Sequence, residues 1–198
     1  MEQHGDNHLG VDWPNMSDLR TRFDIMLDIR KDLTPIKLLD FGCGTGLLYD
    51  YLRSKEMISV EYIGLDISSK FIELCRIKHP AIKFHCLDVN EEPLLFDYDY
   101  AICNGTFTEK LDLTFDEMFD FFSKTVMTLF NKSRKGIAFN VMSSHVDYVR
   151  DDLFHVPHDV MADFIIKNLS RHYVIRNDYG LYEYTIYVYK EPNKNEEA

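Results

Sequence analysis

Short apolar segments and longer amphipathic segments alternate along this chain. The short ones are rich in β-branched and aromatic residues, which is typical of strands, and the longer ones repeat their apolar residues at helical spacing. Strands are predicted over residues 37–41, 60–65, 82–86, 98–103, 136–142, 171–176 and 182–189. Helices are predicted to begin near Ser17, Thr45, Ser68, Thr114 and Pro157. The alternation favours the α/β class, a three-layer αβα arrangement with helices on both faces of a seven-stranded, mainly parallel sheet.

The connection between the last two predicted strands sets the direction of the final one. It spans only residues 177–181 and contains Asp178 and Gly180, which are common turn residues. A parallel crossover needs a dozen or more residues, whereas a hairpin needs few. The last strand is therefore predicted to run antiparallel to the rest.

The helix from Thr114 has the clearest local signal. Thr114 and Glu117 match a capping box, in which side chains satisfy the free amides of the first helical turn. Apolar residues then recur at helical spacing and predict one buried face, formed by Phe115, Met118, Phe119, Phe122, Val126 and Leu129.

Length and composition predict one globular domain. The chain has 198 residues, 45% of them hydrophobic, and no internal repeat or long linker. Apolar runs fall well short of the roughly 20 residues that span a bilayer, and the polar first ten residues have no signal-peptide core. We therefore expect a cytoplasmic protein without membrane association. The net charge of -11 repels phosphate backbones and disfavours nucleic acid as a partner.

Four cysteines are present, at Cys43, Cys75, Cys86 and Cys103. None belongs to a C-x-x-C pair, and three lie in apolar segments. This distribution favours buried free thiols over disulfides or a zinc site, and no metal is expected.

A glycine-rich turn follows the first predicted strand. Asp40, Gly42, Gly44 and Gly46 form the pattern D-x-G-x-G-x-G, and a helix is predicted to follow at once. Glycines leave room for a ligand against the main chain and permit positive φ angles. The turn lies at the carboxyl edge of the sheet, where open α/β folds bind ligands. The dinucleotide fingerprint G-x-G-x-x-G would need glycine at Leu47, so the spacing argues against a nicotinamide-dependent oxidoreductase.

This turn resembles motif I of the class I S-adenosylmethionine (SAM)-dependent methyltransferases, and the chain is most similar to the bacterial small-molecule type. The resemblance covers roughly residues 11–190 and implies a Rossmann-like sheet and SAM as cofactor. It implies that Gly42, Cys43, Gly44 and Gly46 pack along the methionine and ribose of the cofactor. Asp40 would orient the loop or the cofactor amino group from beneath.

Acidic and amide residues follow the next three strands. Asp66, with Ile67 beside it, ends the second strand, where a carboxylate can accept hydrogen bonds from both ribose hydroxyls. By resemblance, Asp88 accepts from the adenine amine and Val89 offers its backbone amide to the ring; an exposed loop aspartate is the alternative for Asp88. Asn104 follows the fourth strand and is expected near the sulfonium, although Asn-Gly is also a common turn.

The segment before the glycine turn is similar to a family lid helix. By resemblance, residues 1–34 form this lid region, residues 35–190 the Rossmann-like core, and residues 191–198 a polar tail. Arg22 would bind the cofactor carboxylate, a task that suits a guanidinium, and Trp13 would cover the cofactor. The alternatives are a solvated helix charge for Arg22 and a core anchor for Trp13.

Base candidates follow the fifth predicted strand. His145 has a pKa suited to proton transfer near neutrality, and Tyr148 or Arg150 could bind a hydroxyl or an anion. A polar surface loop is the alternative interpretation of this segment. Weaker candidates are Glu109, His155 and Tyr182.

The leading hypothesis is methyl transfer from SAM to an oxygen or nitrogen of a small polar acceptor. No N/D-P-P-Y/F motif follows the fourth strand and no substrate domain is inserted, which favours a small molecule. A resemblance to bacterial enzymes of surface glycans points to a sugar or nucleotide-sugar precursor. A non-catalytic SAM-binding regulatory module is the alternative from another class, and a homodimer is left open.

Overall fold

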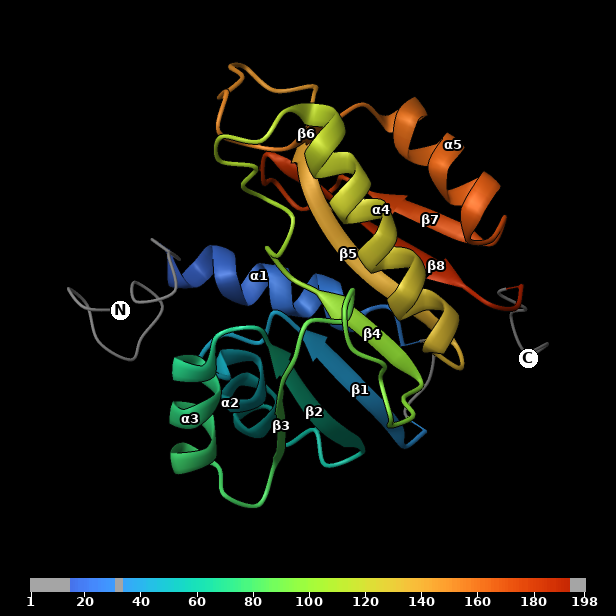
Figure 1. Ribbon diagram of the computed structural model, residues 1–198. Coiled ribbons are helices and arrows are strands. Elements are labelled where there is room, and N and C mark those ends of the chain that lie inside the picture. The colour runs from blue at the N-terminus through green and yellow to red at the C-terminus, as the bar shows by residue number, and fades with distance from the viewer. Residues whose placement is uncertain (1–14, 31–33, 193–198) are drawn as a thin grey trace.

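The computed structural model describes residues 15–30 and 34–192, which form one sheet flanked by helices (Figure 1). The main path of the sheet has the order β3 (Lys83–Cys86), β2 (Val60–Asp66), β1 (Ile36–Phe41), β4 (Tyr100–Cys103), β5 (Gly136–Ser143), β8 (Glu183–Tyr189) and β7 (Tyr173–Arg176). The helices are α1 (Met16–Leu27), α2 (Leu47–Ser54), α3 (Ser69–Lys78), α4 (Phe115–Lys132) and α5 (His158–Asn168). The predicted α/β class is confirmed.

The direction of the last strand is also confirmed. Strands β1 to β5 of the main path pair in parallel, whereas β8 is antiparallel to both β5 and β7. Gly180, in the connection between β7 and β8, has φ +76°, which glycine adopts readily. The short connection therefore forces the chain to reverse, as its length predicts.

One strand was not predicted. The two-residue β6 (His155–Val156) pairs in parallel with Met142 and Ser143 of β5. It lies beyond the end of the β4–β5 ladder, which stops at Phe139. Two residues carry no readable periodicity, so this pairing depends on the tertiary fold alone.

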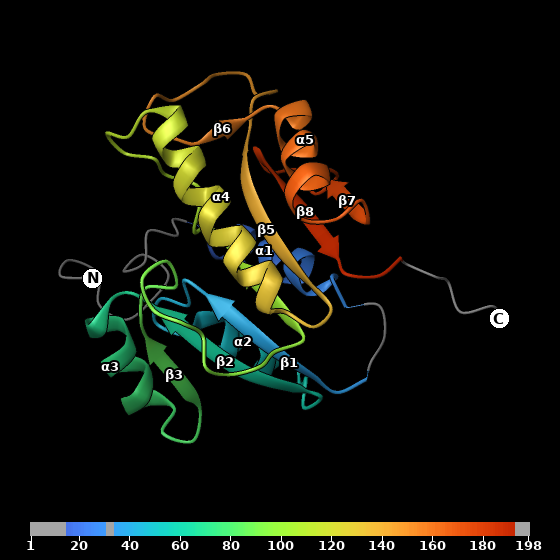
Figure 2. The same cartoon turned by 45° about the vertical axis from the view of Figure 1, so that its right-hand side comes forward.

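Two separate cores cover the two faces of the sheet. Helices α4 and α5 pack on one face, and α1, α2 and α3 pack on the other (Figure 2). Successive strand residues point to opposite faces, so Ile137 and Phe139 of β5 join the first core and Ala138 joins the second. The central strands β4, β5 and β8 are buried almost completely, and most of their residues are apolar for that reason.

The capping box at α4 is confirmed. The Thr114 side chain accepts the Glu117 N–H at 3.3 Å, and Glu117 accepts the Thr114 N–H at 2.9 Å. Most of the predicted apolar face is buried, and Phe115 at its first turn is 36% exposed.

The four cysteines are free thiols, as predicted. Cys86 is exposed rather than buried, because β3 is an edge strand of the sheet. Within residues 15–30 and 34–192, no group of three metal-binding side chains occurs and no helix is long and apolar enough to cross a membrane.

Candidate active site

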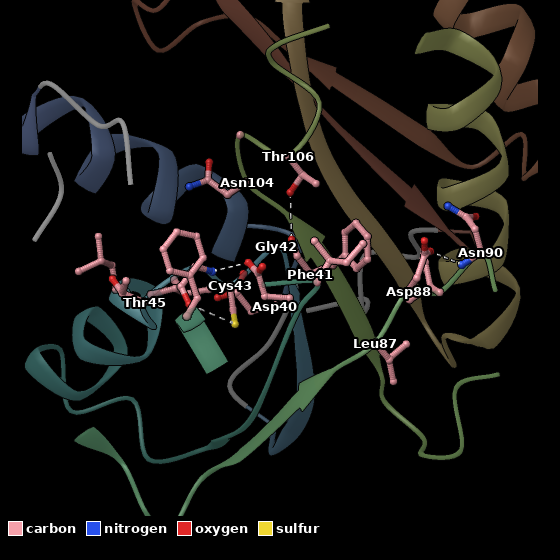
Figure 3. Close-up of a pocket in the computed structure, with 18 of the residues that line it drawn as sticks. Asp40, Phe41, Gly42, Cys43, Thr45, Leu87, Asp88, Asn90, Asn104 and Thr106 are labelled. Atoms are coloured by element: carbon pink, nitrogen blue, oxygen red, sulfur yellow. Dashed lines mark hydrogen bonds between the residues drawn. The ribbon is translucent and has the colours of Figure 1, made fainter. Parts of the chain in front are cut away.

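A cavity of about 380 Å³ opens beside the glycine turn, at the carboxyl ends of β1, β2 and β4 (Figure 3). Segments that are far apart in the sequence supply its walls. They are the turn after β1, the tip of β2, the loop after β3, the turn after β4, and apolar residues of all helices but α5. This is the position at which open α/β sheets bind ligands.

The glycine turn requires its glycines. Gly42, Gly44 and Gly46 have φ angles of +75°, +52° and +81°, which strain other residues. A Cβ on Gly42 would lie 2.6 Å from Thr106 Oγ1, which donates a hydrogen bond to the Phe41 carbonyl at 3.0 Å. The turn after β1 therefore packs directly against the turn after β4.

Asp66 connects the tip of β2 to the glycine turn. Its Oδ2 accepts the Gly44 N–H at 2.9 Å, and its Oδ1 accepts the Ser68 N–H at 2.8 Å. A carboxylate oxygen can accept more than one hydrogen bond, so Asp66 keeps the capacity to bind a ligand that enters the cavity it lines.

Asp40 lies beneath the turn and is 4% exposed. Burial raises the pKa of this carboxyl to about 7, and the nearby charge of Asp66 acts in the same direction. The Tyr62 hydroxyl donates to Asp40 Oδ2 at 2.7 Å and partly offsets the rise in pKa. The Asp40 charge therefore changes near neutral pH.

The loop after β3 is tied to α4. Asp88 Oδ1 accepts the Asn90 N–H at 2.8 Å, and Asn90 Nδ2 donates to Thr125 Oγ1 of α4 at 2.9 Å. Val89 is buried between them and also lines the cavity. These bonds fix the wall opposite the glycine turn.

Three buried polar atoms of the lining have no hydrogen-bond partner among the described residues. They are Thr45 Oγ1, Asn90 Oδ1 and Asn104 Oδ1. Buried polar groups without partners are rare in native proteins, so a polar ligand in this cavity would satisfy them. Thr45 and Asn90 were not predicted; the position of Thr45 between Gly44 and Gly46 is the sequence signal that marks it.

The charge of the cavity has one sign. Asp40, Asp66 and Asp88 line it, and none of its described lining residues is a lysine, arginine or histidine. Such a cavity favours a cation and disfavours the pyrophosphate of a dinucleotide.

A family profile described as a methyltransferase domain matches residues 34–175. The chain belongs to this methyltransferase family. It is 29% identical over 161 residues to a candidate methyltransferase of Mycobacterium tuberculosis, a match that covers 79% of this chain and 94% of the relative.

Solved methyltransferases share the fold. The magnesium protoporphyrin IX methyltransferase from Synechocystis PCC 6803, with bound SAM, has a TM-score of 0.62 at 15% identity, over 88% of this chain and 80% of that one. The SAM-bound amino pentose methyltransferase from Micromonospora echinaspora has a TM-score of 0.58 at 14% identity, over 86% and 90%.

Most of the predicted cofactor residues of this methyltransferase line one cavity: Asp40, Gly42, Cys43, Gly44, Asp66, Ile67, Asp88, Val89 and Asn104. Gly46 is not among them. It is the N-cap of α2 with φ +81°, a conformation that favours glycine. Its assignment to the cofactor stays a prediction. Trp13 lies outside the described residues.

Arg22 is placed elsewhere than predicted. It does not line the cavity, and its Nε donates to both carboxylate oxygens of Glu183 at 2.9 and 3.0 Å. The assignment of Arg22 to the cofactor carboxylate stays a prediction, and the structure gives the side chain a protein partner that sequence reasoning missed.

The predicted base candidates lie outside the cavity lining. His145 is exposed and stacks on His158 with ring centroids 5.4 Å apart, and Tyr148, 62% exposed, lies against Tyr182 at 6.1 Å. The weaker candidate His155 contacts the Ser143 carbonyl through Nδ1 at 2.7 Å.

The remaining residues of this segment are engaged at the surface. Arg150 pairs with Asp152, and Glu109 is exposed and bridges to Leu153. The structure therefore does not bring these groups to the cofactor cavity.

Proposed function

We propose that this methyltransferase transfers the methyl group of SAM to an oxygen or nitrogen of a small polar acceptor. The observation that carries the proposal is the lining of the cavity beside the glycine turn, which has three carboxylates and no described cationic side chain. SAM carries a sulfonium and an ammonium group against a single carboxylate, so its net positive charge matches this lining.

Each wall of the cavity has a proposed role. The turn at Gly42, Cys43 and Gly44 packs along the methionine and ribose. Asp66 accepts from the ribose hydroxyls, and Asp88 accepts from the adenine amine. Three unpartnered oxygens supply further polar contacts for the cofactor: Oδ1 of Asn104, Oδ1 of Asn90 and Oγ1 of Thr45.

When bound, SAM supplies a methyl group that its positive sulfur has already activated. The chain has to orient the acceptor in line with that methyl group and exclude water, which accounts for much of the rate. A hydroxyl acceptor also needs a base, and His145 with Tyr148 on the loop after β5 stay our candidates for proton transfer. An amine acceptor needs only proton removal after transfer.

The acceptor we favour is a sugar or nucleotide-sugar precursor of a surface glycan, methylated in the cytoplasm. Two observations support it: the fold similarity to an amino pentose methyltransferase, and the net charge of -11, which disfavours nucleic acid. We propose no nucleic-acid or membrane partner, and a homodimer is compatible with these roles.

Calorimetry with SAM, S-adenosylhomocysteine and NAD tests the cofactor. We expect micromolar-range binding of the two sulfur nucleosides and none of NAD. The reverse result would refute the proposal.

Acceptor panels of nucleotide sugars, amino sugars and small acids then test the reaction. We expect methyl transfer to a member of the sugar set. Tight SAM binding with no turnover on any panel would support the regulatory module instead.

A further inference from the structure

A charged pair is buried between α1 and the last strand. Arg22 of α1 donates through Nε to both oxygens of Glu183, which begins β8 and is 2% exposed. Buried carboxylates are costly unless they are paired and fully hydrogen-bonded. The pair therefore requires further partners for the remaining lone pairs of Glu183.

Asn140 of β5 provides such a partner. It is fully buried, and its Nδ2 donates to Glu183 Oε1 at 2.8 Å. Because a carboxylate only accepts hydrogen bonds, this contact fixes which end of the amide faces Glu183. Asn140 Oδ1 must point the other way, and it accepts the Gly105 N–H at 2.8 Å.

Gly105 belongs to the cavity wall. It has φ +73° and lies between Asn104, whose Oδ1 is buried without a described partner, and Thr106, which is bound to the Phe41 carbonyl. The hydrogen bond from Gly105 to Asn140 holds the Asn104 end of this turn, as the Thr106 hydroxyl holds the other end. The chain of contacts thus runs from Arg22 to the cavity.

We propose that Glu183 and Asn140 are positioning residues that hold the Asn104 side chain against the cofactor, with Arg22 holding Glu183 in place through its two hydrogen bonds. The inference rests on the proposed function for the identity of the ligand. Its direct target is the Gly105 N–H, which is observable without any ligand.

We call the hydrogen-bond chain from Arg22 through Glu183 and Asn140 to Gly105 the relay. The Asn140→Asp substitution tests whether Asn140 must donate to Glu183 while it accepts from Gly105. When the introduced carboxyl is protonated, it donates to Glu183 and accepts from Gly105, as the amide does. When it is ionised, it cannot donate to Glu183, and repulsion between the two carboxylates should move it out of line with the Gly105 N–H. Two carboxylates that share a site push one pKa well up, so the variant should switch from competent to broken as pH rises.

The groups that face Asn140 and Glu183 are known from the structure. Arg22 lies on the α1 side, and Tyr179, whose pKa is raised by burial and by Glu183, lies on the β7–β8 turn. Asp40, which lines the cavity and whose pKa burial raises to about 7, is unchanged in both of the variants compared in this test. Each measurement is therefore expressed relative to the wild type at the same pH.

Thr185→Val is the matched control. Thr185 is 1% exposed, follows Glu183 by two residues on the same face of β8, and bonds to the Tyr179 hydroxyl at 2.9 Å. Thr185 lies directly opposite Asn140 in the β5–β8 ladder, so the substitution changes a neighbouring side chain but leaves both hydrogen bonds of Asn140 in place.

The readouts are S-adenosylhomocysteine affinity by calorimetry and exchange of the Gly105 amide by NMR. We expect Asn140→Asp to bind within about twofold of wild type near pH 6 and about tenfold more weakly near pH 8.5, with faster Gly105 exchange only at the higher pH. Thr185→Val should differ from wild type by the same small factor at both pH values.

Equal affinity ratios for Asn140→Asp at both pH values, or unchanged Gly105 exchange, would overturn the relay. Absence of ligand binding by the wild type would instead refute the proposed function, and Gly105 exchange would still test the hydrogen-bond chain. The two failures are therefore distinguishable.

Discussion

Asp66 holds Gly44 by its backbone: Oδ2 of the carboxylate accepts the Gly44 N–H at 2.9 Å. The contact exists because β1 and β2 are parallel neighbours, with Phe41 opposite Leu65, so their carboxyl ends leave the sheet together. The residue that we assign to the ribose therefore also shapes the glycine turn, to which we assign the rest of the cofactor.

Asp66→Ala should lose both the proposed hydrogen bonds to the ribose and the support of the glycine turn. We expect S-adenosylhomocysteine affinity, measured by calorimetry, to fall by about 100-fold, because a charge-assisted bond to the ligand and the support of the turn are removed together. Asp163→Ala, at an exposed carboxylate on α5 paired with Lys167, is the control for net charge and should bind as the wild type does. Unchanged affinity in the Asp66 variant would remove the ribose assignment.

The buried Asp40 predicts a stability that depends on pH. Its pKa is about 7 in the fold and about 4 in an unfolded chain, so the folded state keeps a proton that the unfolded state releases in between. The favourable contribution is complete below about pH 4 and is lost as pH rises through 7.

Asp40→Asn should therefore raise the free energy of unfolding above that of wild type at about pH 8, by a few kcal/mol, and change it little near pH 4. The amide oxygen still accepts the Tyr62 hydroxyl. Urea unfolding without ligand at the two pH values measures this difference. A variant that is equally destabilised at both would show that the burial of the charge is not the cause.

The same carboxyl predicts how cofactor binding responds to pH. Because the ionised Asp40 attracts the cationic groups of SAM, wild-type affinity for SAM should strengthen as pH rises through 7. Asp40→Asn should lose this part of the dependence and bind more weakly at about pH 8. A pH titration by calorimetry of the two proteins side by side makes the comparison.

The His145→Gln variant distinguishes an effect on methyl transfer from an effect on cofactor binding. The ring lies on the loop after β5 and outside the cavity lining, so we expect S-adenosylhomocysteine affinity to stay within about twofold while kcat on the identified acceptor falls about 100-fold. His172→Gln, at the start of the β7 segment, is the matched control. Full turnover in the His145 variant would exclude it as the base.

The capping box of α4 predicts a local stability effect. Thr114→Ala removes the acceptor for the Glu117 N–H and should lower the free energy of unfolding by about 1 kcal/mol and the Tm by about 3 °C. Thr114→Ser keeps the hydroxyl and should restore most of the loss. Thermal unfolding followed by circular dichroism compares the three proteins.

The spacing of apolar residues predicted most of the fold, because each long helix or strand repeats its apolar residues with a period of its own. The helices begin within about two residues of their predicted starts, and the main-path strands were found. Strands β4 and β7 each start two residues later than predicted, at Tyr100 and Tyr173. Asp99 instead bonds across the sheet through Oδ2 to the Lys37 N–H. The two-residue β6 has no period and could not be found.

The glycine turn and the carboxylates that follow the neighbouring strands were determined by the sequence itself. Positive φ angles at Gly42 and Gly44 and the placement of Asp66 and Asp88 at strand ends follow from short-range spacing, which any parallel α/β sheet gathers at one edge. That is why the cofactor cavity was largely predictable from the residues alone.

The tertiary structure alone decided where Arg22 binds. Its partner Glu183 is 161 positions away, and the contacts that continue to Asn140 and Gly105 span 43 and 35 positions. Such contacts depend on which strands are neighbours and which face each side chain takes. No local period of the chain encodes the strand order, so these partners become visible only when the sheet is assembled.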